Sequence, residues 1–238
     1  VASYGAYPDN STEHRYTEEE PFRVTDYRYA EEKRIVEEHL KERYAKHANA
    51  ATVAIIRPAA ITGPRGRFQR IRFGLQSARS GSLKGQKSFL YELISLMVSF
   101  VPITPKWLRQ YVHEDDVVAI VEKLSFDTVP VKYEAFNLAP PGAAVYGPDM
   151  AKAVGKRTLS VAPWMIRIVF FFAWHLSRGK VPTSRGSWKG YSYPIAVDGS
   201  KVTRLLGHAY AHESLDAFYY TNGTYEFAVP ENQRRSKP

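Results

Sequence analysis

The sequence predicts an α/β protein with a parallel sheet, and three observations carry this prediction. Segments with helical and strand-like patterns alternate along the 238 residues, as they do in strand–helix–strand units. Residues 52–56 form a continuous apolar run rich in β-branched side chains, which is typical of a buried strand in a parallel sheet. The hydrophobic fraction of 44% is that of a globular chain, and the length allows one large domain or two small ones.

The first half of the chain predicts a surface loop, a long helix and this strand. Residues 8–26 are polar and rich in turn-forming residues. From about residue 27 to residue 47, apolar positions recur with helical spacing. Residues 65–88 are basic, and residues 89–103 are mostly apolar. The predicted helix places Ala30, Ile35, Val36 and Leu40 on one side.

The second half predicts shorter elements. We expect a helix at 112–124, with Asp115 or Asp116 serving its N-terminal turn, and a strand at 133–138. The other expected elements are a helix near 148–154, a strand near 158–161, an apolar aromatic helix at 163–176, a loop at 182–193, a strand at 195–198, a helix capped by Ser200 that ends at Gly207, and a helix at about 212–220.

The composition excludes several kinds of function. The chain has no cysteine, so a disulfide framework, a thiolate metal site and a cysteine nucleophile are impossible. Lys and Arg number 33 against 24 Asp and Glu, a net charge of +9. No nucleic-acid-binding module accompanies this charge, so we expect a small-molecule substrate, anionic or apolar, and no nucleic acid. The opening residues contain no basic and apolar leader, and we expect a cytoplasmic protein.

Tyr29 and Lys33 form the clearest chemical pair. They lie four residues apart in the predicted helix, so they share one face. A free phenol has a pKa of about 10 and is a poor base at neutral pH. A neighbouring cation favours the phenolate and allows general acid–base work on an alcohol or ketone. The same spacing also occurs on ordinary solvated helix faces, so the pair needs support from the rest of the chain.

Several motifs occur in the order found in one enzyme family. They are Ala2-Ser-Tyr-Gly5, Tyr29-x-x-x-Lys33, R-P-x-x-x-x-G-P at 57–64, R-x-Y-V-H-x-x-D-V at 109–117, Asn137-Leu-Ala139, and D-x-S-K followed by L-G at 198–207. This ordered set resembles the extended short-chain dehydrogenase/reductase family, the NAD-dependent epimerase/dehydratase-like proteins. The resemblance spans nearly the whole chain.

The resemblance implies roles for individual residues and a nicotinamide cofactor, NAD or NADP. Tyr29 would be the general acid/base, and Lys33 would bond the nicotinamide ribose and lower the pKa of Tyr29. Arg109 would contact an anionic substrate group, although a surface ion pair with Glu114 or Asp115 is an equal alternative. The backbone of Pro58, Ala59, Ala60 and Ile61 would lie against the nicotinamide.

A second substrate contact comes from an arginine-rich segment. Four arginines, Arg67 among them, fall within the eight residues 65–72, after Gly63-Pro64. We expect either a loop that grips an anionic substrate or an ordinary exposed loop.

The resemblance also implies a division of the chain and an absent portion. The predicted fold class is α/β, a partial Rossmann-type parallel sheet with a smaller C-terminal substrate-binding region. No Gly-rich phosphate turn occurs, and the family's catalytic Ser or Thr position falls just before Val1. We therefore expect about two-thirds of a family member. Residues 1–62 would be the C-terminal half of the dinucleotide-binding domain, 63–108 a substrate-side segment, 109–138 a return to the first domain, and 139–238 the substrate-binding region.

The expected function is that of an NAD(P)-dependent oxidoreductase or epimerase/dehydratase acting on a hydroxyl or ketone through the Tyr–Lys pair. The alternatives are a truncated or degenerate non-catalytic binding protein and a membrane-surface sterol-type dehydrogenase. The helix at 163–176 is too short to span a bilayer, which takes about 20 apolar residues, but it could line a substrate pocket or touch a membrane surface. His208 and His212 have metal-ligand spacing without a third ligand, so we expect no metal. A homodimer remains open.

Overall fold

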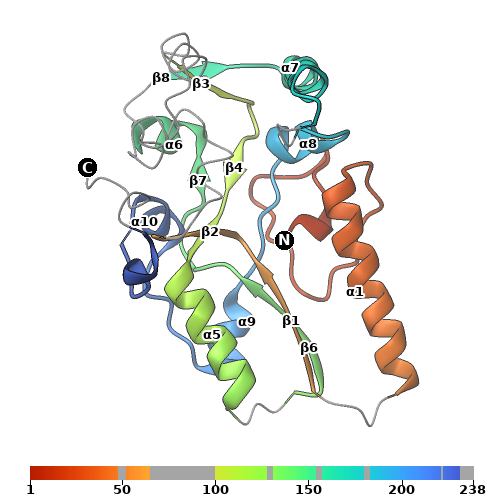
Figure 1. Ribbon diagram of the computed structural model, residues 1–238, viewed down its shortest axis with the longest axis vertical. Helices are drawn as coiled ribbons and strands as arrows, with labels where there is room; N and C mark the ends of the chain where they lie inside the picture. Colours follow the sequence, from red (N-terminus) through yellow and green to blue (C-terminus); the bar gives the residue numbers. More distant parts are fainter. Residues whose placement is uncertain are drawn as a thin grey trace.

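The computed structural model describes residues 1–47, 52–64, 100–127, 131–153, 157–179, 183–220 and 222–230. Short strands run along the middle of the molecule, with helix α1 on one side and helix α5 on the other (Figure 1). The long helix predicted at 27–47 is confirmed as α1, Arg28–Lys46. Helix α5 covers Glu114–Phe126, two residues later than predicted at each end.

Two parallel strand pairs form the central part of the fold. Strand β1, Val53–Pro58, pairs with β6, Tyr133–Leu138, and β6 has the predicted bounds. Strand β2, Ala60–Thr62, pairs with β5, Tyr111–His113. The parallel pairing of segments separated by a helix confirms the α/β class.

Two further pairs lie toward the other end of the molecule, near α6 and α7 (Figure 1). Strand β3, Phe100–Ile103, is parallel to β8, Arg157–Ser160. Strand β4, Leu108–Arg109, is antiparallel to β7, Val145–Tyr146. The remaining helices are α6, Gly147–Ala153; α7, Pro163–Leu176; α8, Ser187–Ser192; α9, Ser200–Leu206; and α10, Ser214–Tyr219; and 3₁₀ turns cover Ala2–Tyr4 and Glu226–Ala228.

The start of α5 differs from the prediction for a local reason. Val112 belongs to β5 and is fully buried, so the helix begins after it. The imidazole of His113 accepts a hydrogen bond from the backbone N–H of Asp115 at 3.2 Å and caps the helix. Asp115 and Asp116 lie in the first turn, where negative charge complements the helix dipole.

Three expectations were wrong. The predicted loop at 182–193 contains α8, which packs against α7. The predicted strand at 195–198 is reduced to one bridge between Val197 and Tyr16, whose N–H donates to the carbonyl of Ala196 and whose carbonyl accepts from the N–H of Asp198. Strand β1 is half-buried, and its one buried side chain is Arg57. We expected other elements to cover the apolar residues of β1 on both faces, and they do not.

The apolar core lies between the strands and α5, α9 and α10. Ile120, Phe136 and Leu138 pack with Val202 in one cluster. Another cluster is centred on Trp107, Tyr111, Val145, Met150 and Phe218. On α1 only Ala30 is buried, while Ile35, Val36 and Leu40 are exposed. Within the described ranges, no helix combines the length and the apolarity that crossing a bilayer requires.

Candidate active site

A cavity of about 260 Å³ lies where β1 ends and α1 begins. Six of the residues predicted from the sequence line it: Tyr29, Pro58, Ala59, Ala60, Ile61 and Arg109. In parallel α/β sheets, ligands bind beyond the carboxyl ends of the strands, and Pro58 is the last residue of β1. The other lining residues are Val1, Ala2, Tyr27, Gln110, Gly190 and Ile195.

Tyr29 occupies the first turn of α1, and its side chain is accessible from the cavity. It is 50% exposed, so a ligand can reach its hydroxyl group. The Nζ atom of Lys33 lies 5.6 Å from the centre of the Tyr29 ring. Lys33 does not line the cavity itself. The pair therefore has the proximity that the helical spacing predicted, and its catalytic role stays a prediction.

The segment from Pro58 to Ile61 forms one wall of the cavity. The N–H of Ala59 donates to the carbonyl of Leu138 at 2.9 Å, and the N–H of Ala60 donates to the carbonyl of Gln110 at 3.1 Å. These bonds tie the segment to β6 on one side and to the turn before β5 on the other. The wall is thus a fixed, mostly apolar surface that could lie against a flat ring.

Arg109 contributes a positive charge to the lining of the cavity. It is 8% exposed. Its predicted substrate contact and the alternative of an ion pair with Glu114 or Asp115 both stay predictions. Its guanidinium donates to the carbonyls of Leu108 at 2.5 Å, Tyr191 at 3.1 Å and Gly190. Asp115, one of the partners considered, accepts hydrogen bonds from Thr224. Arg109 therefore joins β4 to α8 and also borders the cavity.

Two other tyrosines near the cavity differ in what they can do. Burial raises the pKa of Tyr191 to about 12, and its hydroxyl donates to the carbonyl of Pro102 at 2.6 Å. Tyr191 therefore stays protonated at neutral pH and cannot act as a base there. Tyr27 lines the cavity, with its ring centre 6.0 Å from that of Tyr29. Tyr27 was not predicted from the sequence, where its only signal is its place just before the predicted helix.

A buried polar network fixes α1 against β1 and thereby positions Tyr29. Arg57 of β1 is 8% exposed and binds one carboxylate oxygen of Glu37 through Nε at 2.9 Å and Nη2 at 2.8 Å. Its Nη1 donates to the hydroxyl of Tyr4 at 2.6 Å, and that hydroxyl donates to the side-chain oxygen of Asn137 at 3.1 Å. Burial raises the pKa of Tyr4, so its hydroxyl keeps the proton that it donates.

Arg67, the remaining predicted substrate contact, lies outside the described residues. Its role therefore stays a prediction. His208, considered as a metal ligand, bonds the carboxylate of Asp116 at 3.1 Å.

A scan against protein-family models and a search of curated proteins find no match to this chain. Solved structures do match. A dTDP-glucose 4,6-dehydratase from Bacillus anthracis in complex with NAD is 14% identical, with a TM-score of 0.58 over 98% of this chain and 61% of its own. A UDP-galactose 4-epimerase is 16% identical, with a TM-score of 0.53 over 95% of this chain and 60% of its own. A human epimerase family protein with NADPH is 16% identical, with a TM-score of 0.54 over 91% and 60%.

These likenesses define the class of fold. The chain has an α/β, Rossmann-like fold that is similar to the folds of this dehydratase and these epimerases. It spans about 60% of the length of the solved structures that it matches. At such low identities the likeness concerns the fold, and the roles of single residues rest on the geometry of the cavity.

Proposed function

We propose that this chain works as, or within, an NAD(P)-dependent oxidoreductase or epimerase/dehydratase that acts on a hydroxyl or ketone group of a small molecule. The observation that carries the proposal is the single cavity shared by Tyr29, the 58–61 segment and Arg109. These parts are far apart in the sequence, and the family resemblance had given each a role at one site. The NAD or NADPH bound in the similar structures agrees with this cofactor class.

The residues of the cavity fit the nicotinamide end of the cofactor. The fixed wall at 58–61 offers a flat surface for a ring, and Tyr29 presents a hydroxyl beside it. The chain contains no Gly-rich turn, so we assign none of its residues to the pyrophosphate. When bound, the cofactor supplies the hydride chemistry.

The side chains would divide the remaining work. Tyr29 would give or take the hydroxyl proton at its Oη atom, and Lys33 would place a cation next to the phenol. Arg109 would attract an anionic group of the substrate, since its charge borders the cavity. Ala59 and Ala60 would exclude water from the reacting atoms.

The test compares Tyr29→Phe with Tyr27→Phe in the protein expressed from its own gene. Both tyrosines line the cavity, so the second variant controls for loss of a phenol from the same place. We expect Tyr29→Phe to lower kcat by about 100-fold or more, as removal of a general acid/base does. Tyr27→Phe should keep kcat within about threefold, and both variants should still bind NADH. Equal turnover in wild type and Tyr29→Phe would remove Tyr29 from its role.

A second measurement addresses cofactor binding. Titration of NADH fluorescence should show weak or no binding to the 238-residue chain alone and clear binding to the natural gene product. Tight binding by the 238-residue chain would contradict the expectation that the pyrophosphate site lies elsewhere. Absence of NAD(P) binding in both proteins would favour the non-catalytic alternative.

A further inference from the structure

Helix α7 exposes far more apolar surface than its packing explains. Of its 14 residues only Ile166 is buried, and Leu176 at its end is 82% exposed. A helix that is apolar on all sides is normally buried, and a contiguous exposed apolar patch marks an interaction site. Seven large apolar side chains of α7 are exposed: Trp164, Met165, Ile168, Val169, Phe171, Phe172 and Leu176.

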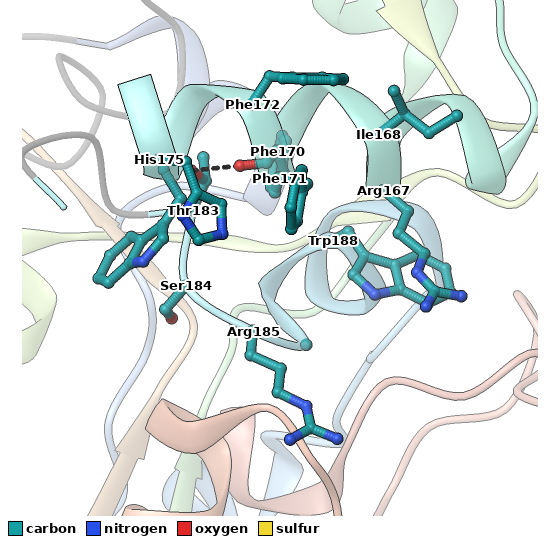
Figure 2. A pocket seen from close by; sticks show the side chains of 12 residues that line it. Arg167, Ile168, Phe170, Phe171, Phe172, His175, Thr183, Ser184, Arg185 and Trp188 are labelled. Atoms are coloured by element: carbon teal, nitrogen blue, oxygen red, sulfur yellow. Dashed lines mark hydrogen bonds between the residues drawn. The ribbon is translucent and has the colours of Figure 1, made fainter. Parts of the chain in front are cut away.

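The apolar surface continues into a groove of about 460 Å³ beside α7. The hydroxyl of Thr183 donates to the carbonyl of Phe170 at 2.9 Å and holds the far wall of the groove against the helix. Figure 2 shows Phe171 and His175 pointing into the groove, while Phe172 points away from it. The ring centres of Phe171 and His175 are 4.3 Å apart. The groove and the outer side of α7 therefore form one surface, which we call the α7 face.

Basic residues predominate in the sequence that forms the α7 face. Between Asp149 and Asp198 the sequence has no acidic residue and eight Lys or Arg residues. Arg167, Arg178 and Arg185 are exposed, and none forms an ion pair with a carboxylate of the described residues. A large apolar surface bordered by unpaired arginines is complementary to a surface that is both apolar and anionic.

We propose that the α7 face docks on the surface of an anionic phospholipid bilayer. Its apolar side chains would enter the boundary between headgroups and acyl chains, and the arginines would contact lipid phosphates. Fourteen helical residues span about 21 Å, which suits a helix lying flat in that boundary. A second copy of the chain would bring the same positive charge to this face, so like-charge repulsion disfavours a homodimer there.

Docking would also bring the candidate active site close to the lipid. Helix α8 contributes Trp188 to the groove and Gly190 to the active-site cavity. The two cavities are therefore separated by one short helix. The docking inference itself does not depend on the proposed catalytic function.

Vesicle co-sedimentation of the full 238-residue chain tests the proposal. We expect at least tenfold stronger partitioning onto phosphatidylcholine vesicles that contain phosphatidylserine than onto phosphatidylcholine alone. High salt should weaken this binding, because it screens the arginine–phosphate attraction. Partitioning should fall at least tenfold in Val169→Glu/Phe172→Glu and in Arg167→Glu/Arg178→Glu.

Control variants carry single substitutions of the same kinds away from the α7 face. Phe126 at the end of α5 and Arg204 in α9 are exposed, so Phe126→Glu and Arg204→Glu should bind vesicles like wild type. Circular dichroism checks that each variant folds. Quenching of tryptophan fluorescence by brominated lipid, weaker in Trp164→Phe than in wild type, gives a second readout that needs no charged substitution.

Three outcomes would overturn the proposal. One is that wild type fails to sediment with anionic vesicles. Another is that the α7 variants bind as well as the controls. The third is light scattering that shows a dimer dissociated by Val169→Glu/Phe172→Glu, because the α7 face would then be covered by a second copy.

Discussion

Replacing Glu37 by Gln should reveal how strongly the buried network holds α1 on the sheet. Glu37 is 14% exposed and Arg57 is 8% exposed, so water screens this ion pair little. Glutamine keeps the size of the side chain and one acceptor oxygen, but it removes the charge that faces the guanidinium. The ion pair lies eight residues after Tyr29, about 12 Å along the helix.

The expected loss of stability follows from the distances. Two unit charges 2.8 Å apart attract each other by about 6 kcal/mol at an effective dielectric constant of about 20. The glutamine oxygen can still accept a hydrogen bond, worth about 1 kcal/mol. Tyr4 and the carbonyl of Glu18 also still contact Arg57. We therefore expect the free energy of unfolding to fall by about 3 kcal/mol, as when one partner of a buried pair is removed.

Urea unfolding followed by circular dichroism measures this loss. A decrease of about 3 kcal/mol corresponds to a midpoint about 1 M lower, for a slope of about 2 to 3 kcal/mol per M. The control is Glu38→Gln, the same substitution one residue later. Glu38 pairs with Arg34 near the surface, so its loss should cost no more than about 1 kcal/mol. Equal midpoints for the two variants would refute the reasoning.

Two further predictions concern backbone space and pH. Gly199→Ala should lower the free energy of unfolding by about 3 kcal/mol, because its new Cβ would lie 2.0 Å from the carbonyl oxygen of Ala139. Gly207→Ala should cost only about 1 kcal/mol, since its Cβ would meet nothing within 4 Å and the left-handed φ of 60° is the sole penalty. Equal urea midpoints for Gly199→Ala and Gly207→Ala would contradict this prediction. Burial raises the pKa of Glu18 above its usual value, so ionising it opposes folding and stability should fall as pH rises through that pKa. Glu18→Gln should remove this loss of stability above about pH 4. Urea unfolding at several pH values measures it, and the same pH profile of stability in Glu18→Gln and wild type would contradict the prediction.

The sequence predicted the fold best where local pattern and tertiary packing agree. The apolar, aromatic run predicted α7 with its exact bounds, and Pro163 stands in the first turn, where proline is favoured. The sequence did not predict α8, because its six residues are too few to form a stable isolated helix. Packing of Trp188 beneath α7 makes that helix form, and such a contact has no local signal.

The candidate site was predictable to the extent that motifs carried it. Tyr29, Pro58 and Arg109 were named from the family resemblance, and the structure brings all three to one cavity. Tyr27 was not predicted, because its place in the cavity depends on how the preceding loop enters α1. The burial of Arg109 was also hidden, since the carbonyls that hold it come from residues about 80 positions later.

The register of β1 and β6 has a consequence for how the chain is made. Val53 pairs with Tyr133, so the partner strand leaves the ribosome about 80 residues after β1 does. At about 5 to 20 residues per second, this delay lasts about 4 to 16 s. For that time the nascent β1 cannot form this ladder and presents its β-branched residues to other chains. Protection of this strand during synthesis, for example by a chaperone, is therefore part of what the topology demands.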